Sequence, residues 1–482
     1  MEALQRLHNQ GSISTGFDID NSLKFEPDNS EFIYRSPSQT GSDQKRMAFS
    51  IWLKRTELGT AQTFMLFGNG GSNSTRLDIG FDTSDRLQIR NVNSNWRLTT
   101  QVFRDTSAWY HLFFQFNTLD TTADDRIKVW VNGNLIAIAD YTTVNDPGYD
   151  ATLGFNRNYK NVLGARQELD STSNQYFAGY IAQVYGSGGT PPAVTDFGEF
   201  DEDTGIWKPI DISDISPPEP INGFFLDFSD ASDLGNDASG NNNNWTLNNI
   251  TSADQATDTP TNNFCTINTI EYTGGYNITN GGTQAERNGN TAWYSTTSSM
   301  GVSKGKWYWE AQFASGATSF MAGVSIDSYI STQANPFDGQ YLGSGSGDGG
   351  FGYNNAGNVY YNNTVTSGYG SAPSTNIIGL AIDMDNEKAY VSINGTWQNS
   401  GDPTSGATGT GAIDLFLDSN GDTAFFSLCA YNPNYTHKIN FGGYTTMSIS
   451  SAASDDNGYG NFEYAPPSGY YALCTKNLEE FG

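Results

Sequence analysis

Cysteine and histidine are scarce in this sequence of 482 residues, and both shortages limit the kinds of site it can carry. The three cysteines, Cys265, Cys429 and Cys474, are odd in number and far apart. Disulfides are therefore not the main framework, and no metal-binding spacing appears. Cys429 lies in an apolar run and is predicted to be a small core residue. His111 also lies in an apolar strand pattern, which predicts a structural role, and no catalytic triad order or zinc spacing emerges.

Basic residues are few as well, with 24 Lys and Arg against 52 Asp and Glu and a net charge of −28. Residues 1–190 are nearly neutral, with 17 basic and 20 acidic side chains. Residues 191–260 hold 1 against 14, and residues 261–482 hold 6 against 18. Without a basic patch, the sequence excludes nucleic acid and anionic lipid as partners. The acidity favours solubility, and cation binding or a salty environment is the alternative explanation.

Long apolar runs are missing too. No stretch approaches the roughly 20 apolar residues that a membrane-spanning helix needs, so no membrane insertion is expected. The first ten residues lack the basic start and apolar centre of a signal peptide, so we expect synthesis in a cytoplasm without export by the general secretory route. Residues 1–14 are predicted to be an attachment segment with one helical turn before Gly11.

Aromatic residues and glycine are plentiful, and apolar residues alternate with polar ones between turn signals. Phe49, Ile51 and Leu53 show this alternation, and a tight Asn132-Gly133 turn predicts a hairpin that returns along residues 135–138. The pattern predicts an all-β fold with two jelly-roll or β-sandwich domains in tandem, each of about 200 residues. The expected domains are residues 15–258, which include an acidic, Pro-rich strap at 186–222, and residues 259–482.

Two family resemblances support this division. Residues 15–255 resemble a laminin G-type, concanavalin A-like jelly roll, on the segments Phe49-Ser-Ile-Trp-Leu53, Trp109-Tyr-His-Leu112, Ile127-Lys-Val-Trp-Val-Asn-Gly133 and Phe177-Ala-Gly-Tyr-Ile-Ala182. Residues 262–482 resemble a SPRY-type sandwich, on Gly305-Lys-Trp-Tyr-Trp-Glu310, Val391-Ser-Ile-Asn-Gly395 and Asn440-Phe-Gly442. Both resemblances imply β-sandwiches.

Further segments are similar to bacteriophage tail-fibre and appendage proteins, notably those of marine phages. They are Asp196–Phe200, Asn222–Phe228, Asp258–Phe264 and Leu473–Leu478. This resemblance implies a protein of the virion surface that contacts other virion proteins and a host cell-surface polysaccharide or protein. Because fibre proteins commonly act as trimers, in which weak contacts gain avidity, a homotrimer is expected. A structural capsid or tail decoration without a ligand is an alternative.

One acidic motif raises the alternative of a polysaccharide depolymerase. In a strand, Glu199, Asp201 and Asp203 would share one face, and retaining glycosidases place two carboxyl groups about 5–5.5 Å apart. The motif resembles the catalytic strand of laminarinases, with Glu199 and Asp201 as its candidate pair, but its spacing departs from theirs. It also lies between glycines in a Pro-rich stretch rather than in an apolar strand, so no enzymatic activity is predicted.

Calcium is the candidate metal. Asp418, Asn420 and Asp422 offer oxygen ligands at alternate positions, as at the start of a calcium loop, although the bidentate Glu of such loops is missing. A hairpin turn is the alternative. The acidic turn formed by Asp120, Asp124 and Asp125 is a second candidate, and no other cofactor is expected.

Aromatic residues in stretches rich in Gly, Asn and Ser are the candidate ligand contacts. Such mixtures combine rigid rings with adaptable polar groups, as in binding loops. Sugar rings offer apolar faces to such aromatics, and their hydroxyls pair with amides. About half of such residues would instead belong to the core. The predicted ligand-binding residues are Tyr341, Tyr353, Tyr360, Tyr361, Trp397 and Tyr431.

Overall fold

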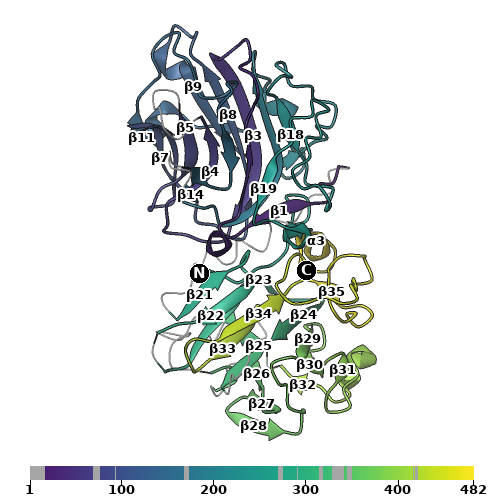
Figure 1. Cartoon of the computed structure of the whole chain (residues 1–482). Coiled ribbons are helices and arrows are strands. Elements are labelled where there is room, and N and C mark those ends of the chain that lie inside the picture. Colours follow the sequence, from purple (N-terminus) through teal and green to yellow (C-terminus); the bar gives the residue numbers. More distant parts are fainter. Residues whose placement is uncertain are drawn as a thin grey trace. The chain divides into compact units, whose positions relative to one another are not determined.

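The computed structural model describes residues 17–68, 76–92, 94–167, 173–269, 275–289, 291–313, 319–327, 341–344, 350–415, 417 and 422–482 (Figure 1). These form two compact units, residues 17–261 and residues 262–482. Both are built almost entirely of strands packed as β-sandwiches, which confirms the predicted fold class. The predicted attachment segment, residues 1–14, lies outside the described residues.

The first unit contains two large sheets. Sheet 1 has the order β10 (Asn134–Leu135), β9 (Ile127–Val131), β8 (Trp109–Asn117), β3 (Arg46–Arg55), β15 (Gly179–Gly188), β1 (Ser22–Phe25) and β20 (Gln255–Ala256), and β18 (Phe224–Leu226) also pairs with β15. Sheet 2 has the order β11 (Tyr141–Val144), β7 (Ser94–Val102), β6 (Arg86–Asn91), β5 (Leu77–Phe81), β4 (Gln62–Phe67), β12 (Asn161–Leu163), β2 (Phe32–Arg35) and β19 (Thr246–Asn248). The short strands β13 (Arg166–Gln167) and β14 (Ser173–Asn174) form a separate hairpin.

The alternation along β3 decides which side of sheet 1 is core. Its inward residues are Met47, Phe49, Ile51 and Leu53, all fully buried. Phe49 meets Phe67 of sheet 2 edge to face, with ring centroids 5.6 Å apart. The predicted return strand at residues 135–138 is wrong in extent, because β10 ends at Leu135 and a 3-10 turn follows at Ile138–Asp140.

The strap, residues 186–222, covers the outer face of sheet 1. It buries Phe197 and Ile212 in a cluster completed by Ala48, Phe113, Tyr185 and Phe225. Within the strap, β16 (Gly198–Phe200) and β17 (Trp207–Pro209) pair as a hairpin, which the sequence analysis did not predict. The apolar residues between the prolines provide the packing that holds this acidic segment on the sheet.

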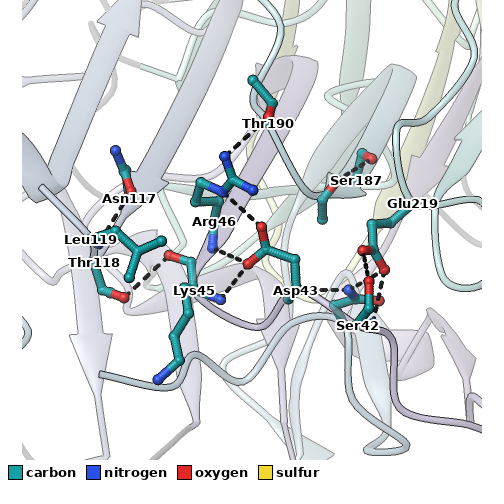
Figure 2. A network of polar contacts seen from close by, with 12 residues as sticks. Ser42, Asp43, Lys45, Arg46, Asn117, Thr118, Leu119, Ser187, Thr190 and Glu219 are labelled. Carbon is teal, nitrogen blue, oxygen red and sulfur yellow. Dashed lines mark hydrogen bonds and ion pairs between the residues drawn. The ribbon is translucent and has the colours of Figure 1, made fainter. Parts of the chain in front are cut away.

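Both ends of the strap are tied to the loop before β3 (Figure 2). Arg46 donates to the Thr190 hydroxyl at 3.1 Å, and its Nε donates to Asp43 at 2.7 Å. At the other end, Glu219 accepts from the backbone N–H of Ser42 at 3.0 Å and from the Ser42 hydroxyl. The strap is therefore anchored to the first unit by polar contacts as well as by its apolar residues.

The second unit also contains two large sheets. Sheet 3 has the order β21 (Tyr276–Thr279), β22 (Gln284–Arg287), β34 (Thr436–Asn440), β24 (Lys306–Gln312), β29 (Ile377–Asp383), β30 (Lys388–Ile393) and β31 (Thr396–Trp397), with β32 (Ile413–Asp414) beside β30 and β35 (Tyr471–Ala472) beside β24. Sheet 4 has the order β23 (Tyr294–Val302), β33 (Ala424–Ala430), β25 (Phe320–Ile326), β26 (Phe351–Asn354), β27 (Asn358–Tyr361) and β28 (Thr364–Ser367).

Helical elements are short. The 3-10 turns are Pro27–Asn29, Ala123–Arg126, Ile138–Asp140, Val194–Asp196, Ser252–Asp254 and Pro403–Thr408. An α-helix, α3 (Thr475–Phe481), ends the chain and was not predicted. No helix among the described residues is long and apolar enough to cross a membrane.

A buried carboxylate organises the outer face of sheet 3. Glu310 accepts from the Asn440 amide at 3.1 Å and from the backbone N–H groups of Glu463 and Tyr464 at 3.1 and 2.9 Å. Burial raises the pKa of Glu310 despite these hydrogen bonds. Its role is structural, because it fixes the C-terminal segment onto the sheet.

Candidate functional site

Four aromatic side chains from distant parts of the sequence form a continuous cluster in the second unit. We define the aromatic cluster as Trp293, Tyr341, Tyr360 and Tyr431. The Trp293 ring lies 5.4 Å from the Tyr341 ring and 5.4 Å from the Tyr431 ring, with interplanar angles of 54° and 55°. Tyr341 in turn meets Tyr360 edge to face at 5.3 Å. These offset geometries are the favourable ones for aromatic pairs.

The cluster lies on the side of sheet 4 that faces away from the core. On β33, Phe426, Leu428 and Ala430 point into the core, so the alternate residue Cys429 points outward. Cys429 pairs with Met321 of β25, and Gly352 of β26 pairs with Tyr360 of β27. The register therefore places Met321, Cys429 and Tyr360 on one outer surface. Figure 1 shows these strands side by side.

A small apolar floor supports the rings. Met321, Leu342 and Cys429 are buried together, and Trp293, Tyr341 and Tyr360 pack against them. Gly352 is needed here, because a Cβ at this position would lie 2.7 Å from the Leu342 Cβ. Burial raises the pKa of the Cys429 thiol to about 12, so this cysteine is an inert packing residue rather than a nucleophile.

Part of each ring remains accessible. Tyr431 is 36% exposed, and the other three rings are half-buried. Backbone hydrogen bonds fix their positions: Ala292 donates to Tyr431 at 3.1 Å, and Tyr431 donates to Ser319 at 3.0 Å. The Asn354 amide lies 3.4 Å from the Tyr360 hydroxyl and supplies a polar group at the edge. The arrangement presents fixed aromatic faces beside amide and hydroxyl groups.

The structure divides the six predicted ligand residues. Tyr341, Tyr360 and Tyr431 come together in the aromatic cluster. The prediction that Tyr353 contacts a ligand is wrong. Tyr353 is fully buried in the core, and its hydroxyl donates to the Gly370 carbonyl at 2.8 Å. Tyr361, on the inward side of β27, packs against the same core.

Trp397 lies elsewhere in the second unit, and Trp293 was missed. Trp397 is half-buried on β31 of sheet 3, and its ring lies 6.4 Å from that of Tyr390. Trp293 follows the sequence Asn288-Gly-Asn290, so the criterion of an aromatic beside Gly and Asn could have found it. The contact with Tyr341 and Tyr431 could not be seen in the sequence.

Glu199 and Asp201 lie in the strap hairpin and share one cation. The Lys208 ammonium is 3.3 Å from a carboxylate oxygen of each residue. The hydroxyl and backbone N–H of Thr204 both donate to Asp201 and lower the pKa of its carboxyl group. A general acid needs a raised pKa, so the lowered pKa disfavours that role for Asp201, whereas a carboxylate nucleophile is already ionised.

The predicted metal sites gain no support from the described residues. Asp418 and Asn420 lie outside these residues, and Asp422 is buried just before β33. In the part of the chain that the structure describes, no group of three or more His, Cys, Asp or Glu side chains could hold a metal ion. The prediction of calcium at Asp418, Asn420 and Asp422 stays a prediction.

The strap covers the outer face of sheet 1, where its residues pack against those of the sheet. His111 stacks between Trp52 and Trp207, with ring centroids 4.8 and 5.8 Å away. The Trp207 indole can only donate, and it donates to His111 Nδ1 at 3.0 Å, so His111 Nε2 carries the proton toward Ser50, 2.8 Å away. Burial lowers the pKa of His111 to about 3. His111 is thus a neutral core residue.

A shallow depression of about 510 Å³ lies where the strap ends, lined by Thr40, Gly41, Ser42, Pro218, Glu219, Pro220 and Ile221. Its carboxylate, Glu219, already accepts from Ser42 and from the Asn156 amide. Burial alone would raise the pKa of Glu219, but these hydrogen bonds outweigh it and lower the pKa. The depression therefore has fewer groups available to bind a ligand than the aromatic cluster has.

Several solved structures are similar to the chain. The SPRY domain of human HERC1 is 18% identical over 34% of this chain and 91% of that chain, with a TM-score of 0.26. A pentraxin from Limulus polyphemus is 15% identical over 36% and 80%, with a TM-score of 0.28. A Bacteroides ovatus protein provisionally described as carbohydrate-binding is 14% identical over 48% and 59%, with a TM-score of 0.30. These scores are low, so we take no function from them.

Sequence comparison gives one family. No curated protein matches the chain. Residues 31–187 match the family model described as the concanavalin A-like lectin/glucanases superfamily, of laminin G type. The matched residues span strands of both sheet 1 and sheet 2, in agreement with the resemblance found in the sequence. The first unit therefore contains a concanavalin A-like domain.

Proposed function

We propose that this protein binds glycans and that the aromatic cluster of the second unit is its binding surface. The observation that carries the proposal is the meeting of Trp293, Tyr341, Tyr360 and Tyr431 on the outer side of sheet 4. Ligand sites combine apolar and aromatic surface with a few placed polar groups. A sugar ring has an apolar face that can stack on such rings, and its hydroxyls can pair with amides such as that of Asn354.

The proposal places the protein on the surface of a phage particle, as part of an appendage. Its support is the similarity of segments such as Asn222–Phe228 and Leu473–Leu478 to tail-fibre proteins. In such a role, several copies would bind a host polysaccharide together, and a homotrimer would turn weak contacts into avidity. Immunogold labelling of intact particles tests this placement, and label confined to the capsid would contradict it.

Removing one ring of the cluster is expected to weaken glycan binding strongly. Aromatic residues at the centre of an interface are commonly worth about 2 kcal/mol, which corresponds to about 30-fold in affinity. We expect a loss of this order for Trp293→Ala in the full chain, measured on an array of host cell-surface polysaccharides. Tyr431→Ala, at the most exposed ring, should weaken binding with little change in melting temperature, whereas Tyr431→Phe should retain it.

Trp397→Ala is the matched control, because Trp397 is also a half-buried indole of the second unit but lies on sheet 3. Its binding should equal that of the unchanged protein. If Trp293→Ala and Tyr431→Ala both fold and bind as tightly as this control, the aromatic cluster is not the binding surface.

The proposal includes no catalysis. The two candidate carboxylates share Lys208, and hydrogen bonding lowers the pKa of Asp201. We expect the polysaccharide that the protein binds to release no new reducing ends during prolonged incubation. Release that disappears in both Glu199→Gln and Asp201→Asn would instead identify a depolymerase.

A further inference from the structure

Sheet 4 carries no charged residue in any of its six strands. The strands read YSTTSSMGV, AFFSLCA, FMAGVSI, FGYN, NVYY and TVTS. In a chain with 16% charged residues, a set of strands of this size would be expected to hold several. Sheet 3 of the same unit does hold them, at Glu286, Arg287, Lys306, Glu310, Asp383, Lys388, Asp414 and Lys438. Burial in a sandwich therefore does not explain the difference.

The segments that carry Trp293, Tyr360 and Tyr431 are equally neutral. Residues 288–303, 350–382 and 424–436 contain no Asp, Glu, Lys or Arg. Their polar groups are amides and hydroxyls, such as the Asn354 amide beside the Tyr360 hydroxyl. A ligand that meets these segments therefore meets hydrogen-bonding groups without a formal charge.

Arg287 is the charged side chain described beneath this region, and it is directed inward. It is fully buried, and its guanidinium lies 4.1 Å from the Tyr294 ring centroid. Its terminal nitrogens donate to the backbone carbonyls of Gly275 and Ala292, at 3.1 and 3.0 Å. Both terminal nitrogens are hydrogen-bonded below the surface, so Arg287 is not placed to form a bidentate contact with a carboxylate or sulfate group of a ligand.

The surrounding charge also disfavours an anionic ligand. Residues 261–482 hold 6 basic and 18 acidic side chains. An acidic polysaccharide approaching this unit would be repelled at long range, and the described cation beneath the cluster, Arg287, is fully buried and donates to backbone carbonyls. A neutral ligand meets neither cost.

We infer that the aromatic cluster takes a neutral polysaccharide, built of uncharged sugars, rather than a uronic, sulfated or sialylated one. This inference rests on the proposed glycan-binding function and specifies its ligand class. Affinity comes from stacking and from hydrogen bonds with amides, so it depends little on ionic strength. Ion-pairing contacts would instead weaken as salt shortens the Debye length.

The test uses the full chain and a matched pair of probes with the same sugar backbone: polygalacturonate and its fully methyl-esterified form, in which each carboxylate is a neutral methyl ester. Dextran, mannan and galactan extend the neutral set, and alginate and chondroitin sulfate extend the acidic set. We expect measurable binding to at least one neutral probe and at least about tenfold weaker binding to every acidic probe, a difference of about 1.4 kcal/mol. Neutral binding should stay constant between about 0.01 and 1 M salt, as the Debye length falls from about 30 to about 3 Å.

The cluster variants separate the possible failures. Neutral binding that is lost in Tyr431→Ala and kept in Trp397→Ala supports the inference. Binding that prefers acidic probes, or that falls steeply with salt, and is still lost in Tyr431→Ala overturns the neutral ligand class but leaves glycan binding at the cluster in place. No binding to any probe overturns the proposed function itself.

Discussion

The folding stability of both units is expected to fall between pH 7 and pH 5 because of one histidine in each. Burial lowers the pKa of His111 in the first unit and of His437 in the second to about 3. In the unfolded chain a histidine has a pKa of about 6.5. Between these values the unfolded state binds a proton that the folded state excludes, so stability is complete above about pH 6.5 and declines as pH falls toward 3.

The size of this effect follows from the shift. Each pH unit below about 6.5 costs about 1.4 kcal/mol per histidine, which gives about 2 kcal/mol in each unit by pH 5 and more at lower pH. Calorimetry of the full chain at several pH values measures it. The choice of window matters, since ordinary carboxyl groups titrate mainly below pH 5, and buried carboxyl groups with a raised pKa, such as Glu310, change stability in the opposite direction.

The variants His111→Gln and His437→Gln separate the contribution of each histidine to the pH dependence. In His111→Gln, the side-chain carbonyl can accept from Trp207 and the amide can donate to Ser50, so both polar contacts of His111 have a substitute. We expect no gain in stability at pH 7, but the first unit of this variant should lose the decline in stability between pH 7 and pH 5. His437→Gln should remove the pH dependence of stability in the second unit only. Slopes that persist in both variants would show that other groups cause the decline.

Asp258→Asn is expected to destabilise the first unit by about 3–5 kcal/mol. The Lys54 ammonium lies 2.7 Å from an Asp258 oxygen, and both side chains are almost completely buried. The other Asp258 oxygen accepts from the Trp109 indole at 3.0 Å. The substitution keeps the shape of the side chain but removes the Asp258 charge that faces the buried Lys54 ammonium, which is the costly way to break a buried pair.

Two variants make this measurement specific. Asp125→Asn removes an exposed partner of Lys128, 3.0 Å away in the same unit, and should change the unfolding free energy by less than about 1 kcal/mol. Lys54→Met combined with Asp258→Asn removes both charges and should recover much of the loss. If Asp258→Asn is as mild as Asp125→Asn in urea denaturation, the buried ion pair does not hold the end of the first unit in place.

The Lys54–Asp258 ion pair also explains why residues 258–261 do not form a loose linker. The Asp-Thr-Pro-Thr pattern predicted a domain boundary near these residues. Asp258, Thr259 and Thr261 are nearly fully buried within the first unit. Pro260 breaks the strand pattern, but the polar side chains beside it form hydrogen bonds within the first unit. Asp258 accepts from Lys54 and Trp109, and Thr261 accepts from the backbone N–H of Ile19.

The sequence by itself determined the fold class and the positions of the main strands. Alternation in Phe49, Ile51 and Leu53 needs only the two-residue period of a strand, which is a local property. The concanavalin-like character of the first unit was also visible, because it depends on segments such as Ile127–Gly133 that lie close together in the sequence. The absence of charged residues from the strands of sheet 4 is also visible in the amino-acid sequence.

Only the tertiary structure decided which aromatic residues form a surface. Tyr353 and Tyr360 have similar neighbours in sequence, yet the pairing of Gly352 with Tyr360 sends Tyr360 outward and leaves Tyr353 in the core. Trp293 and Tyr431 are far apart in the chain and meet through the pairing of β23 with β33. Alternation shows that a strand has two faces, but register and the packing of the second sheet decide which face is buried.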